Sequence, residues 1–151
     1  MYSSSVSPGC LNGWHGYKNS CFYIEAEKTV SSWATARTAC LKHGTRLAVS
    51  QDVSTLGYLK TLAEGTKVGN WYAFYIGASA TQNLKWRWTN GETVSSSAPW
   101  GPREPSGDGN CGTVIKPAGW SGWKLNDENC ATRLGFVCEK IPCKLKVGHF
   151  M

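Results

Sequence analysis

Seven cysteines in a chain of 151 residues constrain this protein more than any other feature of its sequence. None of them forms a Cys-x-x-Cys pair, and the three histidines, His15, His43 and His149, lie far apart along the chain. A zinc site is therefore not expected. The cysteines instead predict a disulfide framework made in an oxidising compartment. Because seven is an odd number, one thiol remains for reaction or for a bond to another chain.

The composition is that of one globular domain. Hydrophobic residues make up 41% of the chain and charged residues 17%, which excludes a disordered chain. The net charge of +6 raises the question of nucleic-acid binding. Lys and Arg are scattered rather than gathered in runs, however, so no nucleic-acid partner is expected.

The sequence also bears on where the protein acts. No apolar run approaches the roughly 18 residues that a membrane span needs, so no span is expected. The first eight residues lack the charged-then-apolar pattern of a secretory leader, and we expect that a leader has been removed. Together with the cysteines, this predicts a secreted, extracellular protein.

Two segments early in the chain have the apolar spacing of surface helices. The first runs from Ser31 to Leu41, with Ser31 or Ser32 as its N-cap and Gly44 as its end signal. The second runs from Asp52 to Ala63 and ends at Gly65. The residues expected to be buried are Trp33, Ala36, Cys40 and Leu41 in the first helix, and Val53, Leu56, Leu59 and Leu62 in the second.

Short apolar or alternating segments predict strands in the rest of the chain. They cover residues 21–24, 47–49, 71–78, 85–89, 111–115, 120–125 and 135–138. Between them, residues 92–110 are rich in Ser, Gly and Pro, and so long a loop in a compact domain is usually functional. Two helices followed by a run of short strands predict an α+β fold with mainly antiparallel sheets.

Two oxygen-rich segments, 103–111 and 124–130, are predicted to be loops, and each ends in a cysteine. If Cys111 and Cys130 are bonded, the two loops are held side by side. Four oxygen-bearing side chains could then converge on one point, namely Glu104, Ser106, Asn126 and Asp127. Carboxylate, hydroxyl and amide oxygens are the ligands that Ca²⁺ prefers.

Three motifs lie among the cysteines: Tyr75-Ile76-Gly77-Ala78, Glu104-Pro105-Ser106 and Leu125-Asn126-Asp127. In this order they resemble the Trp-Ile-Gly-Leu, Glu-Pro-Asn or Gln-Pro-Asp, and Trp-Asn-Asp motifs of the C-type lectin domain. The resemblance implies a C-type lectin fold over residues 10–140, with an N-terminal tail at 1–9 and a C-terminal tail at 141–151. It also implies three disulfides, Cys10–Cys21 of the family's long form, Cys40–Cys138 and Cys111–Cys130.

The resemblance further implies a calcium ion held by Glu104, Ser106, Asn126 and Asp127, with the Glu104–Pro105 bond in the cis form. Two adjacent hydroxyls of a sugar would complete the coordination and bond to the same four side chains. An aromatic ring commonly stacks on the sugar in this family. Trp120 is preferred for this role over Trp100 and Trp123.

Two positions depart from the family pattern. Ser106 replaces a longer amide side chain, and Gly109 stands where family members with complete sites have an acidic residue. Asp108, Asn110 or a water molecule would have to supply the missing ligand. We therefore expect weak calcium binding, with a dissociation constant of roughly 10⁻⁴–10⁻³ M.

The expected function is that of a calcium-dependent lectin that agglutinates or marks glycan-bearing surfaces in innate recognition. The Glu-Pro-Ser sequence resembles a variant in invertebrate members that favour galactose, so galactose or GalNAc is preferred over mannose-type sugars. The alternatives are a mannose-type lectin, and a protein-binding or mineral-associated module of the same fold without sugar binding. An enzyme is not expected, because carboxylates that hold a cation cannot also shuttle protons freely.

The implied disulfides leave Cys143 unpaired. A bond to the same residue of a second chain would make a symmetric dimer. Two weak sugar sites on one particle would raise the avidity by about 10²–10⁴. A disulfide-linked homodimer is therefore expected, with a free thiol at Cys143 as the alternative.

Overall fold

The computed structural model describes residues 9–42, 44–50, 52–64, 73–81, 85–115 and 122–141, without the side chains of residues 27–29 and 64. Some residues to which the sequence analysis gives a role are not among these. The helix end signal Gly65, the stacking residue Trp120, the odd cysteine Cys143 and nearly all of both predicted tails lie outside the described residues.

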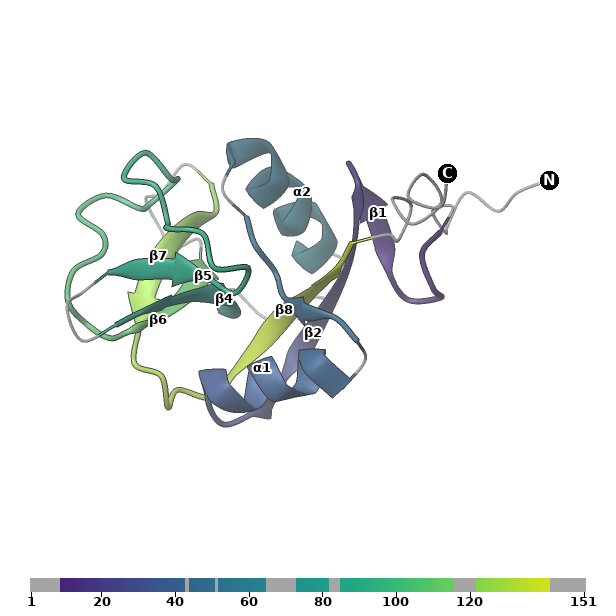
Figure 1. Cartoon of the computed structure of the whole chain (residues 1–151), viewed down its shortest axis with the longest axis horizontal. Coiled ribbons are helices and arrows are strands. Elements are labelled where there is room, and N and C mark those ends of the chain that lie inside the picture. Colours follow the sequence, from purple (N-terminus) through teal and green to yellow (C-terminus); the bar gives the residue numbers. More distant parts are fainter. Residues whose placement is uncertain are drawn as a thin grey trace, which may run out of the picture.

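The described strands form one sheet (Figure 1). Their bounds are β1 His15–Tyr17, β2 Ser20–Val30, β3 Arg46–Leu47, β4 Ala73–Ala80, β5 Trp86–Trp88, β6 Cys111–Ile115, β7 Lys124–Glu128 and β8 Leu134–Lys140. The main path runs β1-β2-β8-β4-β6-β7, with β3 paired to β8 and β5 paired to β4. The β4–β8 pairing is parallel and the other pairings between these strands are antiparallel.

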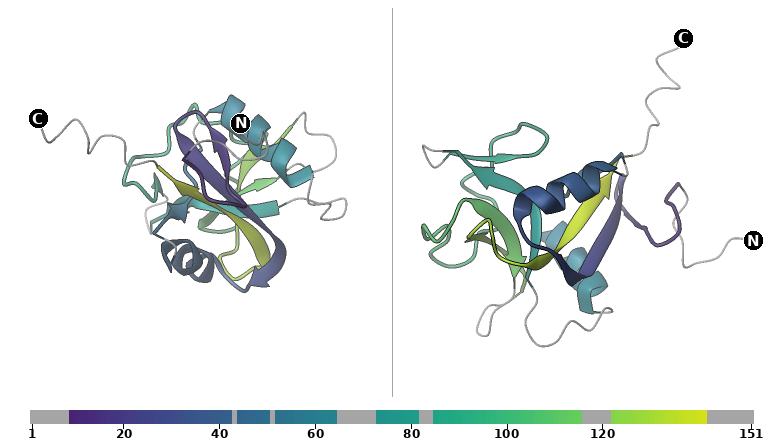
Figure 2. Two further views of the ribbon diagram at one scale, coloured as in Figure 1. Left: turned by 90° about the vertical axis from the view of Figure 1, so that its right-hand side faces the viewer. Right: turned by 90° about the horizontal axis from the view of Figure 1, so that it is seen from below.

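Two helices lie on opposite sides of β2 and β8 (Figures 1 and 2). They are α1, Trp33–Lys42, and α2, Val53–Glu64. The Ser32 Oγ caps α1 by accepting the Thr35 N–H at 3.1 Å, and the Asp52 Oδ1 caps α2 by accepting the Thr55 N–H at 2.7 Å. The chain leaves α1 through Gly44, which adopts a left-handed φ of +70°. The predicted α+β fold is confirmed. Within the described residues, no helix is both long and apolar enough to span a membrane.

Two residues expected in the core are exposed instead. Leu41 in the last turn of α1 is 48% exposed, and Val53 at the start of α2 is 66% exposed. Leu41 directly follows the buried Cys40 and so points about 100° away from it around the helix. Val53 is the first residue of α2. The buried faces consist of Ala36 and Cys40 in α1, and of Leu56, Leu59 and Ala63 in α2.

The sheet separates two apolar clusters. Side chains alternate between the faces of a strand, so Phe74 and Ile76 of β4 join the cluster that contains Leu56 and Leu59 of α2. Tyr75, between them in the sequence, joins the cluster that contains Cys40 of α1. The Cys40–Cys138 disulfide lies in this second cluster and joins α1 to β8. The helices are thereby fixed to the centre of the sheet, and β6 and β7 extend from it to one side (Figure 1).

Candidate functional site

The second oxygen-rich segment, predicted to be a loop, begins with a strand. β7 pairs with β6 along its whole length, from Cys111↔Glu128 at one end to Ile115↔Lys124 at the other. The polar sequence Asn126-Asp127-Glu128 conceals this strand from pattern analysis. Asn126 is nevertheless 7% exposed and Asp127 only 1% exposed. These two side chains are therefore fixed by a sheet rather than by a loop.

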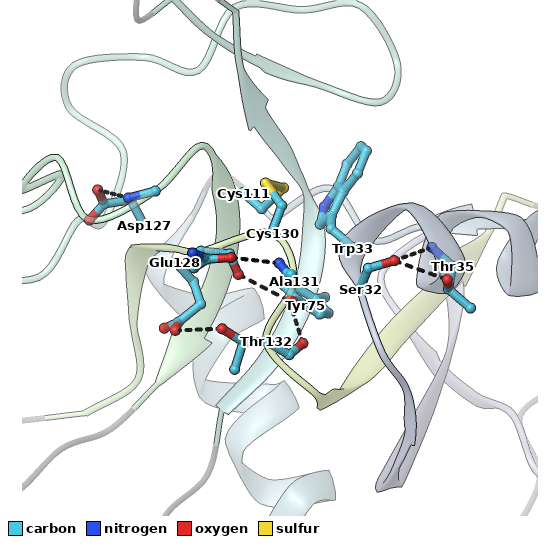
Figure 3. The surroundings of a disulfide bond; sticks show 12 residues. Ser32, Trp33, Thr35, Tyr75, Cys111, Asp127, Glu128, Cys130, Ala131 and Thr132 are labelled. Carbon is cyan, nitrogen blue, oxygen red and sulfur yellow. Dashed lines mark hydrogen bonds between the residues drawn. A yellow bond between two sulfur atoms is a disulfide. The ribbon is translucent and has the colours of Figure 1, made fainter.

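The Cys111–Cys130 disulfide links the first residue of β6 to the chain just beyond the end of β7, as Figure 3 shows. Its surroundings are tied to the core by hydrogen bonds. The Tyr75 hydroxyl donates to the Thr132 carbonyl at 2.6 Å, and the backbone N–H of Trp33 donates to the Cys130 carbonyl at 2.9 Å. The two other implied disulfides, Cys10–Cys21 and Cys40–Cys138, are also present.

The long segment from Glu92 to Asn110 is anchored on β7. Its Gly101 N–H donates to the Leu125 carbonyl at 2.9 Å, and the Leu125 N–H donates to the Pro99 carbonyl at 2.8 Å. Closer to the disulfide, the Asn110 carbonyl accepts the Ala80 N–H at 2.8 Å. These backbone bonds bring residues 104–109 over the middle of β7.

Asp127 is the centre on which this part of the loop closes. Its Oδ1 accepts the Ser106 N–H at 3.0 Å, and its Oδ2 accepts the N–H groups of Gly107 at 2.8 Å and Gly109 at 3.2 Å. The Ser106 Oγ lies 2.9 Å from the Asp108 Oδ2 and 3.2 Å from the Asp127 Oδ1, and donates its single hydrogen to one of them. One buried carboxylate thus organises four consecutive loop residues.

Glu104 shares this centre. The Glu104–Pro105 bond is cis. The Glu104 Oε1 accepts the Ser106 N–H at 3.1 Å, and the Asp127 Oδ1 accepts the same N–H at 3.0 Å, so the two carboxyl groups lie close together. Burial and the hydrogen bond to Asp127 raise the pKa of Glu104 to about 7. Burial acts to raise the pKa of Asp127 as well, but the hydrogen bonds from Glu104 and from the loop amides lower it to about 2. The two carboxyl groups therefore hold one proton between them at weakly acidic pH.

The family model for the Lectin C-type domain matches residues 29–140 of this chain, which includes the whole of the site just described. The chain belongs to the C-type lectin domain family. Human early activation antigen CD69 is 32% identical to it over 96 residues, which cover 64% of this chain and 44% of CD69. The chain spans about half the length of the curated relatives it matches.

Solved structures share the fold of this C-type lectin domain. The SPL-1–GlcNAc complex superposes with a TM-score of 0.74 at 20% identity, covering 88% of this chain and 96% of that one. The Ca²⁺-independent C-type lectin SPL-2 from Saxidomus purpuratus gives the same TM-score and identity, over 87% of this chain and 93% of that one.

The donor chemistry of this C-type lectin domain fits one calcium ion. Glu104 and Asp127 form a carboxyl pair whose shared proton a divalent cation can replace. Asn126 precedes Asp127 in β7, and its Nδ2 donates to the Asp127 carbonyl at 2.9 Å. The described residues contain no group of three or more His, Cys, Asp or Glu side chains that could hold a metal. Two carboxylates, with hydroxyl, amide and water oxygens, suit a weak calcium site rather than a transition-metal site.

The position two residues before Cys111 cannot supply the missing acidic ligand. A Cβ atom built on Gly109 would lie 2.1 Å from the Glu128 carbonyl oxygen, so no side chain fits there without a shift of β7. Asp108, next to it, is exposed and lies beside the Ser106 hydroxyl. Asn110 is also exposed. The close approach of loop and strand at Gly109 could not be deduced from the sequence.

The structure describes two of the three candidate stacking residues, Trp100 and Trp123, whereas the preferred Trp120 lies outside the described residues. Trp123 is 4% exposed and stacks on Phe74 with the ring centroids 5.5 Å apart, which makes it a core residue. Trp100 packs edge-on against Trp86 at 5.1 Å. Trp86 also lines a hollow of about 110 Å³ beside Asp127, together with Pro105, Gly107 and Gly109. Residues 85–89 were predicted only as a strand, and nothing in their sequence indicated that Trp86 lies beside the site.

Proposed function

We propose that this C-type lectin domain binds carbohydrate through one calcium ion held at Glu104, Asn126 and Asp127, with Ser106 and Asp108 as additional oxygen donors. The adjacent carboxyl groups of Glu104 and Asp127, which both accept the Ser106 N–H, carry this proposal. Two carboxyl groups brought into contact repel each other unless a proton or a cation lies between them. Calcium, when bound, supplies a centre that two adjacent sugar hydroxyls can share.

The protein side chains would then decide which hydroxyl pair is accepted. The Glu104 and Asp127 carboxylates accept hydrogen bonds from the sugar hydroxyls. The Asn126 Nδ2 donates one hydrogen to the Asp127 carbonyl at 2.9 Å and retains a second hydrogen for a sugar oxygen. This arrangement reads the spacing of a vicinal diol and needs no catalytic group.

We extend the proposal to galactose or GalNAc as the preferred sugar, over mannose-type sugars. The Glu-Pro-Ser sequence at residues 104–106 supports this choice by its likeness to galactose-preferring variants. The short Ser106 side chain also replaces a longer amide, which removes a donor that an Asn at this position would offer to the sugar. A panel of galactosides and mannosides, competing for one immobilised sugar, tests the order of preference.

Secretion and dimerisation belong to the same proposal. A single weak sugar site gains avidity from a second site on the same particle, and Cys143 would provide the link between two chains. Electrophoresis with and without reductant tests this directly. A dimer that disappears on reduction and in Cys143→Ser supports the link, and a monomer under both conditions removes it.

An immobilised-galactose column tests the function itself. The protein is expected to be retained in millimolar calcium and to elute with a chelator. Glu104→Gln, which keeps the size of the side chain but removes one charge of the pair, should flow through. Glu92→Gln, which removes a carboxylate from the same long segment outside the site, should be retained like the wild type.

The second candidate is a protein-binding or mineral-associated module that needs no calcium. It is favoured by the three backbone N–H groups that already bind Asp127, because they close the loop without an ion. The fold is also that of SPL-2, a lectin described as Ca²⁺-independent. No retention of the wild type on any sugar, with or without calcium, would favour this candidate. Sugar retention that a chelator does not reverse would instead indicate a lectin that needs no calcium.

A further inference from the structure

A second cavity lies apart from the carboxyl pair, between α1 and the strands β2 and β8. Its volume is about 390 Å³, which is within the range of small-molecule sites. No residue of the 92–110 segment or of β7 lines it. The lining residues are Trp14, Tyr23, Glu25, Ala39, Phe136 and Cys138.

Three aromatic rings form its walls. The rings of Trp14 and Tyr23 have centroids 5.5 Å apart and planes inclined by 33°, so they form an angled pair rather than a flat stack. Phe136 of β8 faces the same side of the sheet, since it pairs with Glu25 in the antiparallel register of β2 and β8. Trp14, Tyr23 and Glu25 are each half-buried, and Phe136 is 6% exposed.

A single charged residue lines this cavity among the described residues. The Tyr23 hydroxyl donates to the Glu25 Oε1 at 2.9 Å, which holds the carboxylate beside the rings. Burial and the neighbouring Glu25 raise the pKa of the Tyr23 hydroxyl, so it remains a neutral donor to that carboxylate at physiological pH. The cavity therefore combines aromatic rings, which attract cations, with a carboxylate that is held beside them.

We propose that this cavity binds a quaternary ammonium cation of the size of choline. A primary ammonium group carries three N–H donors and is strongly hydrated, so it would lose more on entering a largely apolar site. A quaternary ammonium has no donors to satisfy, and its methyl groups can lie against the Trp14, Tyr23 and Phe136 rings, with the Glu25 carboxylate nearby to attract the cation. The same chemistry occurs in free choline and in the headgroup of a choline lipid.

The test is a titration of the whole chain with choline chloride in the presence of a chelator, followed by tryptophan fluorescence or NMR. The chelator separates this cavity from the proposed calcium site. The matched probe is 3,3-dimethylbutan-1-ol, which has the shape of choline without its charge. Choline should bind saturably and about tenfold more tightly than the alcohol, as expected for cation–π attraction of roughly 1–2 kcal/mol.

Two variants separate the role of the charge from that of packing. Glu25→Gln should weaken choline binding about tenfold and leave binding of the alcohol unchanged, since it removes only the charge. Glu104→Gln should bind choline like the wild type. Equal affinity for choline and the alcohol, or unchanged choline affinity in Glu25→Gln, would overturn the proposal.

A second arm distinguishes the two sources of the cation. Co-sedimentation with phosphatidylcholine vesicles, absent with phosphatidylglycerol vesicles and abolished by free choline, would identify a lipid headgroup. Saturation by free choline without vesicle binding would identify the soluble cation. No response to either form would overturn the proposal.

Discussion

The two halves of this domain are stabilised in different ways. The half that contains α1, α2, β2 and β8 is stabilised by apolar burial, with Leu56, Leu59 and Val137 at 1% exposure or less and the Cys40–Cys138 disulfide between helix and sheet. The half that contains residues 92–110 depends on backbone hydrogen bonds to β7. At its centre, it depends on one carboxylate, Asp127, that accepts three backbone N–H groups.

The difference indicates how a small fold separates scaffold from function. Many interchangeable apolar contacts support the first half, so no single polar group decides its structure. The second half is organised by Asp127 and its partner Glu104, which are also the residues proposed to bind calcium. Changes at this pair should therefore affect loop structure and ligand binding together, whereas changes in the first half should affect global stability.

The largest expected effect lies in the apolar half. Replacing both Cys40 and Cys138 with Ala opens a loop of 98 residues in the unfolded chain. The free energy of unfolding should fall by about 4–5 kcal/mol, as expected for a cross-link over a loop of this length. Denaturant unfolding measures this loss. A loss under about 1 kcal/mol would show that the disulfide adds little to the apolar packing.

The next effect distinguishes the two halves most sharply. Asp127→Asn keeps the shape of the side chain but removes the charge that accepts the Ser106, Gly107 and Gly109 N–H groups. We expect a loss of roughly 1.5–3 kcal/mol, the range for a hydrogen bond to a charged group. Hydrogen exchange should accelerate at Gly107 and Gly109 and remain unchanged in β4.

Asp108→Asn is the control for this substitution, because Asp108 is exposed and contacts only the Ser106 hydroxyl among the interactions described above. It should change stability by less than about 0.5 kcal/mol. If Asp127→Asn left the exchange of the loop amides as it is in the wild type, Asp127 would not be the organising group.

A smaller effect tests the close approach of loop and strand. Gly109→Ala places a Cβ atom against the Glu128 carbonyl and should cost about 1–3 kcal/mol, the range for overpacking. Gly122→Ala is the matched control, since its Cβ atom meets nothing within 4 Å. Equal stability of the two variants, measured by thermal unfolding, would mean that the loop moves away from β7 at no cost.

The smallest effect is a pH dependence of the metal-free protein. The pKa of Glu104 is raised to about 7, so its contribution to stability is complete below its ordinary value of 4.5 and is lost as the pH rises through 7. Asp127, with its pKa lowered to about 2, contributes above its ordinary value of 3.8 and loses that contribution only as the pH falls through 2. At pH values between the ordinary pKa of Glu104, 4.5, and its raised value of about 7, the titration of Glu104 therefore determines whether stability rises or falls with pH.

In a chelator, the melting temperature should therefore fall by a few degrees between about pH 5 and about pH 8. Glu104→Gln should show a weaker pH dependence over this interval, because its amide does not titrate. A wild-type melting temperature that rises over the same interval would contradict the carboxyl pairing.

The sequence predicts the two halves unequally well. Apolar spacing, with Ser31 or Ser32 as the cap of the first helix, sufficed to predict both helices, because these signals are local in the chain. The Asp52 cap of α2 was not predicted. The polar strand at Asn126 and Asp127 gave no such signal, since its burial comes from a loop some 20 residues away in the chain. The donors to Asp127 were missed because they are backbone N–H groups, and a side-chain pattern carries no information about which backbone N–H groups will meet a carboxylate.

Calorimetric titration of calcium into the metal-free domain, with and without galactose, tests the central claim most directly. The wild type should bind one calcium ion with a dissociation constant of about 10⁻⁴–10⁻³ M, Glu104→Gln should give no binding heat, and galactose should bind only when calcium is present. Galactose binding in a chelator, or no calcium uptake by the wild type at millimolar concentration, would contradict a sugar site built on the Glu104–Asp127 pair.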